Sequence, residues 1–191
     1  MNILTKTFGG RIVCRPDTTW EKDNADFYPP QFVEALTYAP VFFAHILKPG
    51  RSVQKKFAGR YFDGIGFGIL LYPQNIMDGS PEGYAEALCL DKTSYLPAPC
   101  ISPAEYSSLP SETEFILKKN EHILFRCAIP PLSMVEDAIV QASRLAYIRT
   151  GDAVAIELAA RSPLMQKSEL RDTIASGQVG SGGKLDFSII F

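Results

Sequence analysis

Hydrophobic and polar residues alternate most clearly in the middle of the chain and at its C-terminal end. Residues 61–71 read as a strand in which Gly64, Gly66 and Gly68 alternate with large apolar residues. One face of that strand carries no side chains, so we expect another part of the protein to pack close to it. In the tail, 184–191, every second residue is a large apolar one, which predicts a half-buried strand.

The clearest helical pattern begins near Ser133. Apolar residues recur at helical spacing over 135–148, and Ser133 with a glutamate three residues later forms a capping-box pattern. Shorter helices are predicted over 52–60, with Ser52 as the cap, and over 82–90. The rest of the chain is rich in short apolar runs separated by Pro, Gly and Asp.

Several of those runs predict further strands. They lie at 11–14, 41–46 and 153–158, and 115–125 reads as a hairpin that turns at Asn120. Many strands with a few short helices are typical of an α+β, mainly β, architecture rather than a doubly wound one. At 191 residues, the simplest organisation is a single domain covering 1–191.

The amino-acid composition excludes several classes of function. Hydrophobic residues make up 46% and charged residues 21%, and the formal net charge of −2 offers no basic face for nucleic acid or anionic lipid. No apolar run reaches the roughly 18–20 residues of a membrane span, and no secretory signal is visible. The four scattered cysteines form no C-x-x-C pair. We therefore expect buried, reduced thiols in a cytoplasmic protein and no structural zinc.

The most informative segment is 48–69, which reads KPGRSVQKKFAGRYFDGIGFGI. It resembles the sequence motif "G-x-x-I-x-x-KFA-x-x-YYD-x-IG-x-GID-x-TARD" of the fumarylacetoacetate hydrolase (FAH) superfamily. Residues 11–28 are similar to the family's "KPDTAL" strand and turn, with Arg15 where lysine is usual. The hairpin at 115–120 and the Thr150-Gly151-Asp152 turn also match in order and spacing. The resemblance implies an FAH-like mixed β-roll with a few short helices, assembled as a homodimer.

The resemblance also implies a chemistry. Members of the family cleave, isomerise or decarboxylate 2-keto and enol acids with a divalent ion, Mg²⁺ or Mn²⁺, which is held by a Glu-x-Glu pair on one strand and an acidic residue on the next. Hard cations of this kind need several carboxylate oxygens. The resemblance places those three ligands at Ala39, Val41 and Leu70, and the family's conserved lysine at Leu88. The metal cofactor is therefore predicted to be lost.

Two further family motifs are missing. The N-terminal "N-Y-x-x-H" motif has no counterpart, and the "TGTP" loop is replaced by residues 156–159. The chain thus resembles a truncated and degenerate member of the family. Polar residues that could remain in the old cleft are Arg15, which could meet a carboxylate at its mouth, His45 and Glu157. A nucleophilic pair of Cys89 or Cys100 with His45 stays open as an alternative, although no signature supports it.

Three hypotheses follow. The first is a non-catalytic FAH homologue, a pseudoenzyme with a binding or structural role, which could still take a small carboxylate ligand. The second is a metal-independent hydrolase, isomerase or decarboxylase acting on a 2-keto or enol acid through Arg15, His45 and Glu157. The third is a partner subunit that pairs with an active paralogue.

Overall fold

A computed structural model describes all 191 residues and contains two β-sheets. The larger sheet has eight strands and mixes parallel with antiparallel pairs. Its spatial order is β2 (Ile12–Pro16), β1 (Asn2–Lys6), β9 (Ala153–Glu157), β4 (Ala35–Ile46), β5 (Phe62–Pro73), β6 (Ser94–Tyr95) and β3 (Trp20–Glu21), with β10 (Ser162–Gln166) also paired to β4. The α+β, mainly β, architecture expected from the sequence is confirmed.

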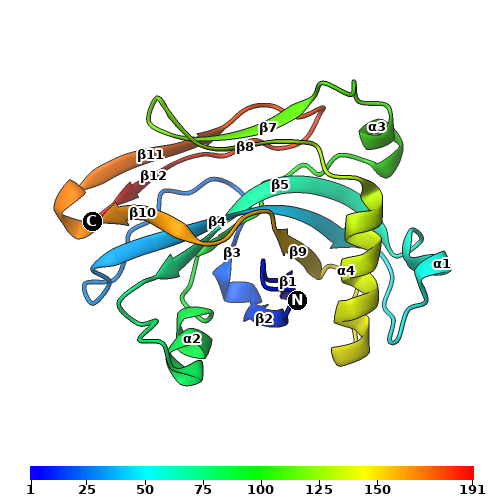
Figure 1. The fold of residues 1–191 in the computed structure, drawn as a ribbon, viewed down its shortest axis with the longest axis horizontal. Helices are drawn as coiled ribbons and strands as arrows, with labels where there is room; N and C mark the ends of the chain where they lie inside the picture. Colours follow the sequence, from blue (N-terminus) through cyan, green and yellow to red (C-terminus); the bar gives the residue numbers. More distant parts are fainter.

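The smaller sheet lies across one face of the larger one (Figure 1). Its order is β12 (Asp186–Ile190), β11 (Arg171–Ser176), β7 (Glu114–Lys119) and β8 (His122–Ala128). The helical elements are α1 (Lys55–Ala58), α2 (Pro81–Ala87), α3 (Pro103–Ser107), α4 (Leu132–Leu145) and the 3-10 turns η1 (Asp17–Thr19) and η2 (Lys167–Glu169). None of these helices has the length and apolar character needed to cross a bilayer.

Strands β4 and β5 form the centre of the fold because both of their faces are buried. Side chains alternate along a strand, and here the alternation separates two cores. Phe42 of β4 and Phe67 of β5 point toward the smaller sheet, where Phe67 stacks on Phe115 with ring centroids 4.6 Å apart. Ala39 and Val41 point the opposite way.

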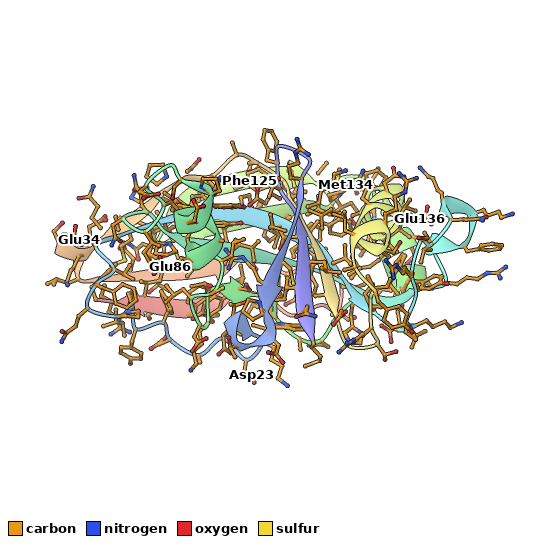
Figure 2. The ribbon with its side chains drawn as sticks, turned by 90° about the horizontal axis from the view of Figure 1, so that it is seen from below. Asp23, Glu34, Glu86, Phe125, Met134 and Glu136 are labelled. Atoms are coloured by element: carbon orange, nitrogen blue, oxygen red, sulfur yellow. The ribbon has the colours of Figure 1, made fainter.

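The second core is called the inner cluster below. It lies between β4–β5 and the layer made by the β1–β2 hairpin, β3 and α2, which covers the sheet on the side away from the smaller sheet (Figures 1 and 2). Its buried members are Ile3, Ala39, Val41, Phe43, Leu70, Tyr72, Leu88, Leu96, Ala153 and Ala155.

The glycine face of β5 belongs to this inner side. A Cβ atom on Gly66 would lie 2.5 Å from the Phe43 ring, and one on Gly68 would collide with the carbonyl group of Tyr95. The close packing predicted from the alternating glycines is therefore confirmed. A larger residue there would displace the Phe43 ring of the neighbouring strand β4 or the backbone of β6 at Tyr95.

Several local predictions are wrong. Ser52 does not cap a helix: its φ is 51°, and α1 begins only at Lys55 after Gln54. Ser133 is not a cap either, because Pro131 holds the extended N-cap position and α4 already begins at Leu132. Strand β4 is also longer than the predicted 41–46.

The cysteines are free, but they are not all buried. Cys14 and Cys89 are exposed, whereas Cys100 and Cys127 are partly buried. The expectation of four buried thiols is therefore wrong for Cys14 and Cys89. Burial raises the pKa of Cys100 and that of Cys127 to about 11, with nearby carboxylates adding to the effect.

Candidate functional site

The three positions where the resemblance implies metal ligands meet in the inner cluster. Ala39 and Val41 lie two residues apart on β4 and so share a face, and Leu70 is the cross-strand partner of Ala39 on β5. All three side chains are fully buried. Leu88, at the end of α2, is 5% exposed and packs into the same cluster. The fold brings these four positions together and fills the space between them with hydrocarbon.

These residues do not fit a hard divalent cation. Mg²⁺ and Mn²⁺ are bound through carboxylate, carbonyl and water oxygens, and Ala39, Val41 and Leu70 offer no such side-chain donor. No group of three or more His, Cys, Asp or Glu side chains anywhere in the chain is arranged to hold a metal ion.

Arg15 lies deep in the fold rather than at the mouth of a cleft, contrary to the sequence-based expectation. Its side chain is fully buried. One Nη donates to the carbonyl of Leu71 at 2.9 Å, and the other donates to Thr93 Oγ1 at 3.0 Å, Ser94 Oγ at 3.1 Å and the Thr93 carbonyl at 3.3 Å. The guanidinium also lies over the Tyr72 ring, 4.4 Å from its centroid.

These bonds close the larger sheet on itself. Arg15 comes from β2 at one end of the strand order, whereas its acceptors belong to β5 and to the segment that forms β6 near the other end. The sheet must curl for these groups to meet. Arg15 therefore acts as a structural closure. Its Nε has no hydrogen-bond partner, but the side chain is fully buried, so a ligand has no access to it.

Glu157 is buried at the end of β9, and both of its oxygens have protein partners. Tyr72 donates its hydroxyl hydrogen to Oε1 at 2.5 Å, and the backbone N–H of Phe8 donates to Oε2 at 2.7 Å. Burial strongly raises the pKa of Tyr72; Arg15 opposes this shift and the Glu157 carboxylate adds to it. Tyr72 therefore remains a neutral donor, and Glu157 is held in place by two short bonds.

A cavity of about 430 Å³ opens beside this pair. Its lining consists of Thr7, Phe8, Gly9, Arg11, Val13, Tyr84, Glu157, Ala160 and Arg161. The Arg161 guanidinium lies 4.8 Å from the Tyr84 ring centroid and 5.1 Å from that of Tyr72. We call it the rim cavity. It combines two exposed arginines, Arg11 and Arg161, with the buried carboxylate of Glu157.

His45 does not join Arg15 and Glu157. It stands six residues beyond Ala39 on β4, about 20 Å along the strand, and its Nδ1 lies 2.7 Å from Asp63 Oδ1. It lines a different cavity together with Cys100. Because the pKa of the Cys100 thiol is raised to about 11, that thiol is protonated at neutral pH and is a weak nucleophile. Cys89 is exposed and directs its thiol to the Ala85 carbonyl at 3.5 Å.

Sequence reasoning missed Tyr72, Tyr84 and Arg161. Tyr72 could have been found, because it follows Leu70 by two residues and must share its face if 61–71 continues as a strand. Tyr84 and Arg161 lie on α2 and on the loop after β9. No local pattern indicates that these two segments meet over Tyr72.

No family model matches the sequence, and no protein in the curated collection of sequences matches it significantly. The fold, in contrast, matches solved structures along the whole chain. Fumarylpyruvate hydrolase from Pseudomonas aeruginosa, solved with Mn²⁺ and pyruvate, superposes with a TM-score of 0.81 at 13% identity over 100% of this chain and 90% of the other. A protein assigned to the fumarylacetoacetate hydrolase family from Yersinia pestis CO92 gives 0.78 at 16% identity, over 99% and 92%.

A third similar structure is the 2-hydroxyhepta-2,4-diene-1,7-dioate isomerase from Mycobacterium marinum, with a TM-score of 0.77 and 13% identity over 99% of this chain and 74% of that protein. Such low identities establish the fold and leave the activity open. The neighbours share an architecture whose named members are hydrolases and isomerases. The chain has the fold of the fumarylacetoacetate hydrolase family.

Proposed function

We propose that this chain is a non-catalytic protein with the FAH fold, a pseudoenzyme whose role is binding or structural. The observation that carries the proposal is the inner cluster: where the resemblance implies three metal-binding carboxylates and a lysine, the chain has Ala39, Val41, Leu70 and Leu88, all buried together. An unpaired carboxylate would be costly in that environment. The apolar replacements therefore favour a stable metal-free core.

The polar groups that remain also support a role without chemistry. Arg15 has three or more protein acceptors, and both oxygens of Glu157 are occupied. A general base must be free to reach the proton that it removes, and Glu157 is not free. Neither residue can change partners without breaking contacts between β2, β5 and β9.

The proposal includes a ligand and a partner. The rim cavity, with Arg11 and Arg161 on its lining, is the place where a small carboxylate would bind, since guanidinium groups pair with carboxylates. We further propose that the protein works as a homodimer, as the resemblance implies, or pairs with an active paralogue. No metal cofactor is part of this function.

A turnover assay tests the lack of activity. Purified protein is incubated with oxaloacetate and with an acylpyruvate in the presence of Mn²⁺, and product is measured by absorbance. We expect no rate above the uncatalysed one, because nothing in the inner cluster can stabilise the developing enolate. The fumarylpyruvate hydrolase of the same fold serves as the positive control. A Mn²⁺-dependent rate removed by EDTA would contradict the proposal.

The second candidate, a metal-independent enzyme on a 2-keto or enol acid, is favoured by one observation. Glu157 and its short bond to Tyr72 lie on the wall of the rim cavity. This candidate predicts turnover that survives EDTA and is lost in Glu157→Gln. His45→Ala should leave that turnover unchanged, because His45 lines a separate cavity. EDTA-resistant turnover lost in Glu157→Gln would replace the first proposal with this one.

A further inference from the structure

A second cavity, also of about 430 Å³, lies at the His45 end of β4 and shares no lining residue with the rim cavity. It is called the β3 cavity here, because Trp20 and Glu21 of β3 line it together with Leu96, Cys100 and His45. Trp20 donates its indole N–H to the Leu96 carbonyl at 3.1 Å, which fixes the ring as part of the wall. The volume is in the range of small-molecule sites.

Glu21 differs from every other buried carboxylate of the protein. The buried acidic residues are Glu21, Asp152, Glu157 and Asp172. Asp152 accepts from the N–H of Asn2 on one oxygen and from that of Arg149 on the other. Glu157 is held on both oxygens, as described above. Asp172 accepts from the Asn120 amide on Oδ1 and pairs with the Lys119 ammonium on Oδ2, each at 2.8 Å.

Glu21, in contrast, has only one partner. It is 9% exposed, its Oε1 accepts from the N–H of Asp23 at 2.8 Å, and its Oε2 has no hydrogen-bond donor from the protein. It forms no ion pair, although the cavity is also lined by Lys22 and by Met1, whose N-terminal ammonium pairs with Asp17 at 3.5 Å. Asp23, which is labelled at the edge of the molecule in Figure 2, adds a further negative charge beside it. The free Oε2 is reached from the cavity and is not sealed in the protein, because the buried side-chain atoms without a hydrogen-bond partner belong to Thr5, Arg15, Tyr84 and Asp172. Carboxylates with such low exposure are normally paired with a positive group.

A missing positive partner at a carboxylate that faces an open cavity indicates a cationic ligand. We propose that the β3 cavity binds a small organic cation, a primary ammonium group carried on an apolar body. The ammonium pairs with Glu21, and the body packs against Trp20 and Leu96. His45 also lines the cavity, and its Nδ1 lies 2.7 Å from Asp63 Oδ1. This site is independent of the function proposed for the inner cluster and the rim cavity.

The fluorescence of Trp20 tests this proposal directly, because Trp20 is the only tryptophan in the chain. The probe is benzylamine, which is a benzylammonium ion at neutral pH, and benzyl alcohol and benzoate are its neutral and anionic counterparts. We expect a saturable change with benzylamine at concentrations below about 10 mM. The affinity for the alcohol should be at least about tenfold lower, since charge-assisted hydrogen bonds are worth roughly 1.5–3 kcal/mol.

Glu21→Gln separates charge from shape. It keeps an acceptor for the Asp23 N–H and the same size, so the fold should be retained, which circular dichroism checks. We expect benzylamine affinity to fall about tenfold or more in this variant and to stay unchanged in Glu34→Gln, an exposed glutamate outside the cavity. Equal binding of amine and alcohol, unchanged binding in Glu21→Gln, or no saturable signal would each overturn the proposal.

Discussion

Replacement of Arg15 by alanine should lower the free energy of unfolding by about 3–5 kcal/mol, which is a large part of the stability of a domain of this size. The guanidinium is fully buried and bonds to Leu71, Thr93 and Ser94 from the opposite end of the curled sheet. Its removal leaves buried acceptors without donors and a cavity beneath Tyr72. Urea unfolding followed by circular dichroism measures the loss.

Two variants make this prediction specific. Arg11→Ala, an exposed arginine on the same hairpin, should change the stability by no more than about 0.5 kcal/mol. Arg15→Lys should restore only part of the loss, because an ammonium cannot copy the planar, multidentate geometry of a guanidinium. If Arg15→Ala unfolds at the wild-type urea concentration, Arg15 does not close the sheet, and a ligand-binding role for it returns.

The resemblance implies a carboxylate at position 70. Introducing one there is expected to lower the free energy of unfolding at least as much as Arg15→Ala does. Leu70→Asp should cost about 4 kcal/mol or more, because it removes a fully buried leucine and places a charge among Ala39, Val41 and Phe43. Adding Mn²⁺ at about 1 mM should not restore the stability, since a single carboxylate is a weak ligand for a hard cation. Thermal and urea unfolding with and without the ion measure both effects.

Leu70→Met is the matched control for this experiment. A volume-conserving apolar exchange should cost less than about 1.5 kcal/mol. A Leu70→Asp protein as stable as the wild type would mean that water reaches the inner cluster, and the view of a filled site would be wrong. Recovery of stability by Mn²⁺ would mean that other oxygen donors lie within reach of position 70.

The parts of the fold that the sequence predicted are those with a strong local period. The glycine alternation over 61–71 identified β5 and its close-packed inner face, and the helical spacing after Ser133 located α4. The misassigned caps have local causes. Pro131 already holds the extended backbone that Ser133 was expected to supply, and Ser52 lies in the left-handed region, outside the extended conformation typical of an N-cap.

The candidate site was predictable only where it lies on one strand pair. Ala39, Val41 and Leu70 could be placed together because strand alternation and antiparallel pairing relate them directly. The contacts of Arg15 could not be predicted from the sequence. Its partners Thr93 and Ser94 follow it by 78 and 79 residues and meet it only when the sheet curls. His45 and Glu157 lie at opposite ends of the β4–β9 ladder, where they pair with Ala153 and Val41. The position of Arg161 over Tyr72 is likewise a tertiary contact that no local pattern indicates.

Titration of the purified protein with Mn²⁺, followed by the electron paramagnetic resonance signal of the free ion, measures whether the inner cluster still holds a metal. Bound Mn²⁺ loses most of this signal, so the experiment counts ions held by the protein without requiring any substrate. Since Ala39, Val41 and Leu70 provide no oxygen ligand, we predict that all the ion remains free up to about 1 mM. One Mn²⁺ bound per chain with micromolar affinity would contradict the account.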